Sequence, residues 1–324
     1  MGAWAVLVNF GSHGLIAENA RWTTGTGRPV EGVVVVDNYS SDAERLSITE
    51  LCTRRGWVLA PRPTNEGFAA ACNVGVGVAR DHGARNVLLV NPDARVPEDV
   101  VGALGRQLDA EPLTLVSPLV VTSQGATYFQ GSRVDLRSGR MRGRRWADEA
   151  VEPAYVSSDW PYRDWLSGAC LAFSVLLWQR AGGLDERYFL YWEDVDFSER
   201  CVRAGGRLCL RRDLQVVHDE GATHGEQGSR ARSSTYYYYN CRNRLVYAAA
   251  HLPVRAVLRW VVATPAESRQ ILLRGGRRQL LQSPRPLLAT LRGSLAGLSE
   301  VARVLPGIGR KTASSSRKRT SSAK

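Results

Sequence analysis

Short apolar runs alternate with helical segments through the first hundred residues, and this alternation restricts the chain to few folds. The apolar runs are residues 5–8, 33–36, 57–59 and 87–90. Four consecutive valines at 33–36 are typical of a strand buried on both faces of a parallel sheet. The segments between the runs are helical in pattern and span residues 15–20, 43–55 and 69–80. The sequence therefore predicts an α/β fold, with a doubly wound, mostly parallel central sheet and helices on both faces.

The composition is that of a globular protein large enough for one α/β domain and an appendage. The chain has 324 residues, of which 44% are hydrophobic and 23% charged,. No stretch of about 18 uncharged apolar residues occurs, so no membrane-spanning helix is expected. The N-terminus has the pattern of a first strand and no basic leader. Six cysteines without a CxxC pair or zinc-like spacing predict reduced, buried thiols of a cytosolic protein,.

The net charge of +12 is concentrated at the C-terminal end. Residues 265–324 hold thirteen Lys and Arg against two Asp and Glu, whereas residues 1–264 hold 30 Arg and 29 acidic residues. The larger part of the chain is therefore nearly neutral. We predict no specific nucleic-acid partner, and a nucleic-acid role would rest on the tail alone.

Ligands of doubly wound sheets bind at the carboxyl ends of the strands, so the polar residues after each apolar run are candidates. Asp37 follows the valine run and can accept the imide N–H of a uracil or thymine ring. Asp42 is expected instead to cap the next helix. Asn65, Glu66 and Gly67 lead into the helix at 69–80. They fit either a phosphate contact near a helix N-terminus or a plain helix start.

Two further candidates also follow predicted strands. Asp93, in Asn91-Pro92-Asp93, is suited to a divalent cation that bridges two phosphates, or to a β-turn. His218 follows the strand-like residues 214–217 and is either a metal or phosphate contact or a structural residue. His224 competes with it for the same role.

Residues 182–200 combine acidic and aromatic side chains more densely than any other segment. Aromatic walls around a carboxylate exclude water and raise its basicity. A general base that removes a proton from a sugar hydroxyl needs that property. Two simpler interpretations remain: Asp196 and Arg200 form an i,i+4 pair, or the segment is an ordinary acidic helix start. The aromatic residues are Tyr188, Phe189, Tyr191 and Trp192.

Together these segments resemble glycosyltransferase family 2, and within it the rhamnosyltransferase-like branch. The resemblance covers roughly residues 3–245, with the motifs in the family's order. Its most specific part is the stretch Gly-Leu-Asp-Glu-Arg-Tyr-Phe-Leu-Tyr-Trp-Glu-Asp-Val-Asp from Gly183. The other matching segments are residues 8–9, 37–42, 65–73, 91–93 and 165–168.

The resemblance implies a GT-A fold and a UDP- or dTDP-sugar donor, with dTDP-rhamnose as the expected one. Asp37 would read the pyrimidine, and Asp93 would hold Mg²⁺ or Mn²⁺ with His218 as a second metal or diphosphate contact. Asp194 would be the catalytic base, with Glu193 beside it to orient the acceptor. The family's second metal-motif Asp is Asn91 here. The donor-binding residues that the resemblance implies are Asn9, Asp37, Asn65, Gly67, Asn73, Asn91, Trp165 and Gly168.

The expected reaction is an inverting transfer of a sugar to a hydroxyl of a saccharide or lipid-linked acceptor, in cell-envelope polysaccharide synthesis. Asp194 would take the hydroxyl proton, while the nucleoside diphosphate leaves from the opposite face of the sugar. The alternative is a non-catalytic sugar-nucleotide-binding or assembly protein on the same fold, because fold does not fix activity.

Arginines alternate with apolar residues through residues 252–305, as in helices that lie in a membrane interface,. This pattern predicts an anionic membrane partner and a cytoplasmic location at the inner face of the plasma membrane. The alternative is that these helices pack on the catalytic domain. The predicted organisation is a GT-A domain at 1–250, a basic helical appendage at 251–305 and a disordered basic tail at 306–324.

Overall fold

The computed structural model describes residues 2–144, 153–156, 160–218 and 232–320, with only the backbone for 153, 154, 156 and 306–320. Contacts divide the chain into two compact units. Unit 1 comprises Met1–Arg133 and Arg142–Gln227, and unit 2 comprises Val134–Met141 and Gly228–Lys324. The second unit therefore includes residues before the predicted boundary at 250, and the predicted domain limits remain a prediction.

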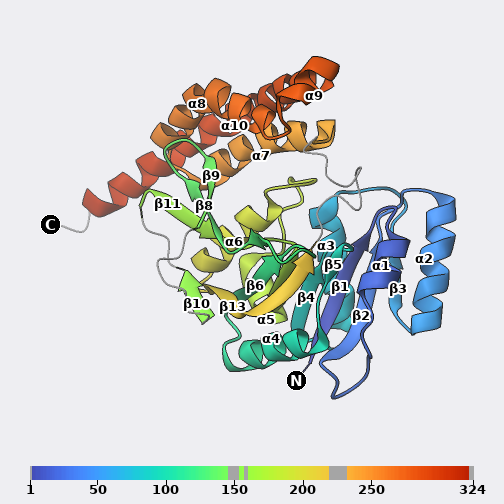
Figure 1. Cartoon of the computed structure of the whole chain (residues 1–324). Helices are drawn as coiled ribbons and strands as arrows, with labels where there is room; N and C mark the ends of the chain where they lie inside the picture. The colour runs from blue at the N-terminus through green and yellow to red at the C-terminus, as the bar shows by residue number, and fades with distance from the viewer. Residues whose placement is uncertain (1, 145–152, 157–159, 219–231, 321–324) are drawn as a thin grey trace. The chain divides into compact units, whose positions relative to one another are not determined.

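Unit 1 alternates strands and helices over its first half, as the apolar runs predicted (Figure 1). Its elements to the end of the fourth helix are β1 (Ala3–Asn9), α1 (His13–Asn19), β2 (Val30–Asp37), α2 (Asp42–Arg55), β3 (Val58–Pro61), α3 (Phe68–Asp81), β4 (Asn86–Val90), β5 (Ala94–Arg95) and α4 (Glu98–Ala110). The later elements are β6 (Thr114–Val121), β7 (Thr127–Phe129), β8 (Ser132–Asp135), β9 (Arg140–Gly143), β10 (Pro153–Val156), β11 (Tyr162–Trp165), β12 (Cys170–Ser174), α5 (Val175–Ala181), α6 (Glu193–Arg203) and β13 (Arg207–His218).

The large sheet has the strand order β10-β13-β6-β12-β4-β1-β2-β3. Strands β4, β1, β2 and β3 are mutually parallel, and β13 is parallel to β6. Strand β12 runs antiparallel between β4 and β6. The alternating first half thus forms the parallel part of the sheet, and the irregular middle of the chain contributes the antiparallel strands.

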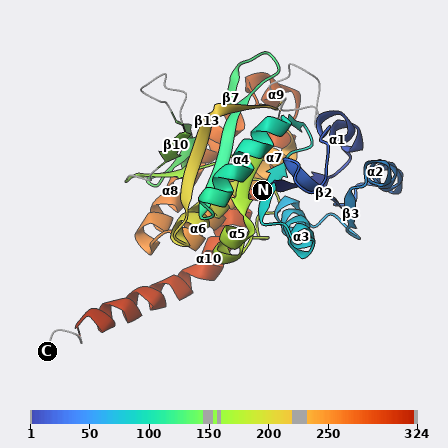
Figure 2. The same cartoon turned by 90° about the horizontal axis from the view of Figure 1, so that it is seen from below.

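The sheet is buried on both faces, which is why its strands are apolar without alternation. Ala5, Leu7, Val33 and Val35 belong to one core, with residues of α1, α2 and α4. Val6, Val8, Val34 and Val36 face the other core, with residues of α3, α5 and α6. Figure 2 shows the sheet between these helices. The predicted α/β fold with helices on both faces is confirmed.

Strand register brings the predicted site residues to one edge of this sheet. Asn9 pairs with Asp37 at the ends of β1 and β2. Cys170 pairs with Val90 at the end of β4, and His218 pairs with Ala94 at the start of β5. Residues that are far apart in sequence therefore lie around the carboxyl ends of β1, β2 and β4.

Unit 2 contains the end of β8, the start of β9 and the helices α7 (Ser234–His251), α8 (Val254–Leu273), α9 (Arg277–Gln282) and α10 (Arg285–Thr320). Gly275-Gly276 separates α8 from α9, and Ser283-Pro284 separates α9 from α10. The structure continues α10 to Thr320, through a segment predicted to be disordered. No helix among the described residues is long and apolar enough to cross a membrane. All six cysteines are free and buried, as predicted.

Candidate active site

The loop before Asp194 is held in an uncommon backbone conformation. Tyr191 and Trp192 have φ angles of 65° and 74°, so two consecutive bulky residues occupy the left-handed region just before α6 begins. Such a conformation costs free energy and persists only where the surroundings enforce it. Burial of Tyr188 and Trp192 supplies that support. The buried aromatic side chains therefore hold the backbone that leads into Glu193 and Asp194.

The same loop packs against the N-terminus of α3. The Phe68 N–H donates to the Phe189 carbonyl oxygen at 2.7 Å. Gly67 has a φ of 92°, and a Cβ there would lie 2.7 Å from that same oxygen. Gly67 was predicted to allow close approach of a nucleotide. In the structure its missing side chain makes room for the backbone of Phe189.

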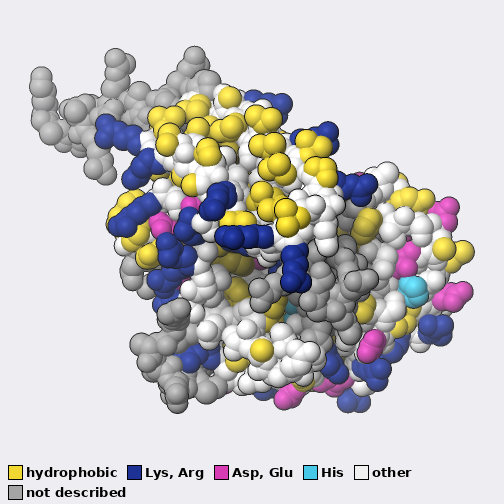
Figure 3. Space-filling model, turned by 45° about the horizontal axis from the view of Figure 1, so that its top comes forward, with side chains coloured by type: hydrophobic (Ala, Val, Ile, Leu, Met, Phe, Trp, Pro, Cys, Tyr) yellow, Lys and Arg dark blue, Asp and Glu magenta, His cyan; other side chains and the backbone are white. Residues whose placement is uncertain are grey.

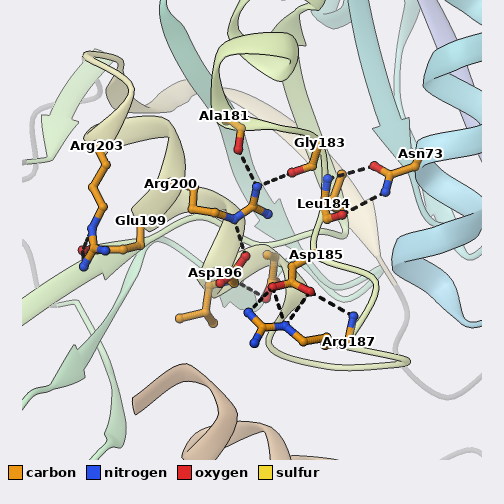
Figure 4. Close-up of polar contacts among 12 residues, drawn as sticks. Asn73, Ala181, Gly183, Leu184, Asp185, Arg187, Asp196, Glu199, Arg200 and Arg203 are labelled. Carbon is orange, nitrogen blue, oxygen red and sulfur yellow. Dashed lines mark hydrogen bonds and ion pairs between the residues drawn. The ribbon is translucent and has the colours of Figure 1, made fainter. Parts of the chain in front are cut away.

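Asn73 and Arg200 hold the loop from two helices, as Figure 4 shows. The Asn73 side chain accepts from the Leu184 N–H and donates to the Leu184 carbonyl, both at 2.8 Å. Arg200 donates to Asp196 at 2.6 Å, in the i,i+4 pair considered from the sequence, and to the Ala181 carbonyl at 2.6 Å. The amide of Asn73, predicted to contact the donor, is engaged in holding this loop.

Asp194 is partly exposed in the first turn of α6 and is oriented by two backbone groups. The Gly168 N–H donates to its Oδ2 at 3.0 Å, and the Val195 N–H donates to its Oδ1 at 2.8 Å. Burial raises the pKa of Asp194 to about 6, while these two N–H donors act in the opposite direction. A carboxylate with this pKa is ionised at neutral pH and is a stronger base than an ordinary Asp, as general base catalysis requires.

Glu193 precedes Asp194 and points into the protein. Its side chain is buried, and Oε2 has no hydrogen-bond partner among the described residues. Burial, and next the Asp194 carboxylate, raise the pKa of Glu193 well above its ordinary value. Both effects favour the protonated form of Glu193 over the charged form.

Backbone hydrogen bonds connect Asp194 to the end of β4. The Asn91 N–H donates to the Ala169 carbonyl at 3.1 Å, and the neighbouring Gly168 N–H binds Asp194. The Ala94 N–H donates to the Asn91 carbonyl and closes the turn that contains Asp93. The predicted base, Asp194, and the predicted metal ligand, Asp93, are therefore linked by a short series of hydrogen bonds that backbone N–H groups donate.

Asp93 and His218, the two predicted metal ligands, lie side by side. His218 Nε2 is 3.0 Å from Asp93 Oδ1, and both side chains are almost fully buried. The Tyr128 ring covers the imidazole, with ring centroids 4.9 Å apart. Neither ring nitrogen of His218 makes a well-aligned hydrogen bond to a described residue. His224 lies outside the described residues.

This pair fits a divalent cation that also takes phosphate oxygens and water. Mg²⁺ and Mn²⁺ accept carboxylate and imidazole ligands, and Mg²⁺ uses one or two protein carboxylates beside substrate phosphates. The described residues contain no cluster of three or more His, Cys, Asp or Glu able to hold a metal by themselves. The cation would therefore depend on the diphosphate for much of its coordination.

Asp37 is completely buried at the end of β2. Its Oδ2 accepts from Arg45 Nε at 2.7 Å, and its Oδ1 accepts from Asn9 Nδ2 at 3.3 Å. Arg45 is partly exposed and also lies over the Tyr39 ring. A pyrimidine would reach the Asp37 carboxylate only after Arg45 moves. The helix α2 is capped by Ser41, whose Oγ accepts from the Glu44 N–H, so the cap predicted at Asp42 was one residue too late.

The remaining candidate residues differ in their hydrogen bonding. Asn65 Oδ1 accepts from Asn38 Nδ2 at 2.9 Å and from the Gly67 N–H at 3.0 Å, which shapes the entry to α3. The Trp165 indole N–H is buried without a partner among the described residues. Arg45 and Tyr128 were missed, because neither lies in a recognisable motif. An Arg eight residues after a strand-end Asp was the one available signal for Arg45.

A comparison with solved structures supports the fold. A mannosyltransferase from Pyrobaculum calidifontis, solved in complex with GDP-Man and Mn²⁺, matches with a TM-score of 0.50 at 15% identity, over 93% of this chain and 86% of that one. The chain accordingly has the GT-A fold. No protein-family model matches it.

Two curated relatives indicate which glycosyltransferases this chain resembles. The chain is 28% identical over 279 residues to the N-acetylglucosaminyl-diphospho-decaprenol L-rhamnosyltransferase of Mycobacterium tuberculosis, covering 79% of this chain and 89% of that protein. It is 22% identical over 273 residues to the dTDP-rhamnosyl transferase RfbF of Shigella flexneri, covering 81% and 85% respectively. These relatives confirm the predicted resemblance to rhamnosyltransferase-like glycosyltransferases.

Proposed function

We propose that the protein transfers a sugar, with inversion, from a nucleoside-diphosphate-sugar to a hydroxyl of a saccharide or lipid-linked acceptor in envelope glycan synthesis. The observation that carries this proposal is the Asp194 carboxylate, partly exposed, raised in pKa and fixed by the Gly168 N–H beside the end of β4. The similarity to enzymes named as rhamnosyltransferases supports a rhamnosyl donor.

Asp194 acts as the general base in this mechanism. Above pH of about 6 it is ionised, and it accepts the proton of the acceptor hydroxyl as that oxygen attacks the anomeric carbon,. The bond from the anomeric carbon to the nucleoside diphosphate breaks on the opposite face, so the configuration inverts. Burial and the neighbouring Asp194 carboxylate raise the pKa of Glu193, which favours its neutral form beside the charged base.

Asp93 and His218 hold the diphosphate side of the site. They would bind Mg²⁺ or Mn²⁺, which when present neutralises charge on the leaving diphosphate. Their near-complete burial keeps the pair in place before the donor arrives. Asn9 and Arg45 both bind the buried Asp37 carboxylate, and this group would shape the part of the site that takes the nucleoside.

The test begins with thermal stabilisation by a panel of UDP-, dTDP- and GDP-sugars, with and without Mn²⁺, followed by assay of sugar transfer from the donor that binds. Asp194→Asn should lose roughly a thousandfold in kcat and keep donor affinity, because the amide cannot accept the proton. Asp99→Asn removes an exposed carboxylate from α4 and serves as the matched control. Full activity in Asp194→Asn would refute the proposed base.

A non-catalytic sugar-nucleotide-binding protein would give a different result. Donor stabilisation would be present in the wild-type chain and in Asp194→Asn, but no donor and acceptor pair would yield a product. Determining the anomeric configuration of the product by NMR tests inversion separately from transfer.

A further inference from the structure

Helix α10 carries several large apolar side chains on its outer face. Its inner face has small residues, and a Cβ on Gly293 or Gly297 would lie 2.2 Å from the Tyr238 carbonyl oxygen or 2.9 Å from that of Arg242. α10 thus packs closely on α7 through a Gly-x-x-x-Gly contact. The opposite face exposes leucines at 287, 291 and 295, which are 49%, 53% and 64% exposed. A helix facing water normally has polar residues there.

Helix α8, which contacts α10, also exposes apolar side chains. Val262 is 80% exposed and Leu258 is 48% exposed, one turn apart. A hydrogen bond of 2.9 Å between the Ser268 and Ser294 hydroxyls joins α8 to α10. Figure 3 shows hydrophobic side chains gathered over the helices of unit 2, with Lys and Arg side chains among and around them.

The charged side chains around the exposed apolar residues of α8 and α10 are mostly positive. Residues 252–305 contain nine arginines, all exposed, and two acidic residues. Glu267 is paired with Arg140 at 2.7 Å, and Glu300 is paired with Arg242 at 3.1 Å. Glu300 also lies 3.4 Å from Arg303, and among the described residues the other eight of these arginines have no ion pair.

A hollow of about 310 Å³ lies between α7 and the start of α10. Its lining includes Tyr238, Tyr239, Arg285 and Arg292. Arg285 and Arg292 are two helical turns apart, and within the described part of the chain their guanidinium groups have no ion-pair partner. Leu288 lines the same hollow next to the exposed leucines. Two arginines and two tyrosines that line one hollow suit a phosphate group, and the adjoining leucines suit hydrocarbon,.

We propose that unit 2 docks on an anionic phospholipid bilayer through α8 and α10, with a lipid phosphate in the hollow between Arg285 and Arg292. The exposed leucines enter the interface, and the arginines contact the negatively charged headgroups. Apolar area and charge attraction act together in such docking. This inference concerns binding alone and is independent of the sugar-transfer reaction.

The charge requirement is tested by flotation of the full chain with phosphatidylcholine vesicles and with an equal mixture of phosphatidylcholine and phosphatidylglycerol. We expect the chain to bind the mixed vesicles and to be released by salt. Arg285→Gln/Arg292→Gln should weaken binding roughly 30-fold. The control Arg54→Gln/Arg106→Gln removes the same charge from exposed positions of unit 1 and should leave binding unchanged. Equal losses in both double variants would overturn the phosphate site.

The apolar requirement is tested with Leu287→Ser/Leu291→Ser/Leu295→Ser, which should weaken binding at least about tenfold. Leu46→Ser, at an exposed leucine of α2, is its control. Circular dichroism of each variant checks that the helices remain folded. A second copy of the chain is the competing occupant of this face. If the triple variant turned a dimer into a monomer in sedimentation and bound vesicles like the wild type, the docking proposal would be wrong.

Discussion

His218 Nε2 lies 3.0 Å from Asp93 Oδ1, because β13 pairs with β5 at the point where the turn after β4 ends. The carboxylate and the imidazole come from distant parts of the sequence, yet the antiparallel register places them in contact. Both would serve one cation bound with the diphosphate. One protein ligand alone would bind the cation weakly. The property to test is therefore whether Asp93 and His218 bind it together.

Replacing either ligand should raise the Mn²⁺ concentration needed for activity. We expect Asp93→Asn and His218→Ala to increase the half-saturating Mn²⁺ concentration by roughly 10- to 100-fold, because each removes one of two protein ligands. Electron paramagnetic resonance of Mn²⁺ with nucleoside diphosphate measures the same affinity without turnover. Unchanged Mn²⁺ affinity in both variants would exclude this pair as ligands.

The rate should increase with pH on the acid side. Burial raises the pKa of Asp194 to about 6, so the carboxyl is protonated, and inactive as a base, below that pH. We expect kcat/KM to fall about tenfold per pH unit below this pKa and to level off above it. The pH profile of kcat/KM, with saturating metal, checks this expectation. A flat profile from pH 5 to pH 8, in roughly the range where His and shifted carboxyls titrate, would contradict it.

Glu193→Gln should keep most of the activity. The raised pKa of Glu193 favours its neutral form, and Gln has nearly the same shape without a charge. We expect kcat within roughly threefold of wild type, whereas Asp194→Asn loses about a thousandfold. Glu193→Asp keeps the carboxyl group but shortens the side chain. Comparing it with Glu193→Gln shows whether activity depends on the shape of the side chain or on its carboxyl group. A large loss in Glu193→Gln would show that an ionised Glu193 is required.

Asn73→Asp should reduce stability and leave the donor KM unchanged. The new carboxylate cannot donate to the Leu184 carbonyl, which leaves a backbone acceptor unpaired at a cost of about 1–3 kcal/mol,. Urea unfolding gives the stability change, and donor titration gives KM. If stability were unaffected while KM rose strongly, Asn73 would be a donor contact, as the family resemblance implied.

Arg45→Met should destabilise unit 1 by about 3–5 kcal/mol, because it leaves the fully buried Asp37 carboxylate without its charged partner,. Adding Asp37→Asn should recover part of this loss, since the unpaired charge is then removed. Urea unfolding of both single variants and the double variant measures the coupling. Additive effects would indicate that the pair contributes nothing as a unit.

The sequence predicted most of the fold, because valine runs report burial on both faces of a sheet. Predicted strands and helices of the first hundred residues agree with β1 to β4 and α1 to α3 within a few residues. The antiparallel insertion of β12 was not predictable in this way. Its pairing depends on contacts with β4 and β6, which no local periodicity encodes.

The site was partly predictable, for a related reason. Residues at strand ends, such as Asp93 and His218, were chosen as candidates because parallel strands present their carboxyl ends together, and the structure places these two side by side,. The burial of Asp37 under Arg45 was not foreseen, because it depends on how α2 packs rather than on the motif itself. The engagement of Asn73 with Leu184 depends on a loop more than a hundred residues later in the chain.

The connection from Asn91 through Ala169 and Gly168 to Asp194 lies just beyond the end of β4 and just before β12. It consists of one backbone–backbone hydrogen bond, from the Asn91 N–H to the Ala169 carbonyl, and one bond from the Gly168 N–H to the Asp194 carboxylate. Only the second bond depends on a side chain, so replacements at other positions leave both bonds in place. The spacing between the base and the diphosphate side should then persist up to the melting of the sheet. A temperature series would show catalysis and the far-ultraviolet signal of the strands disappearing together.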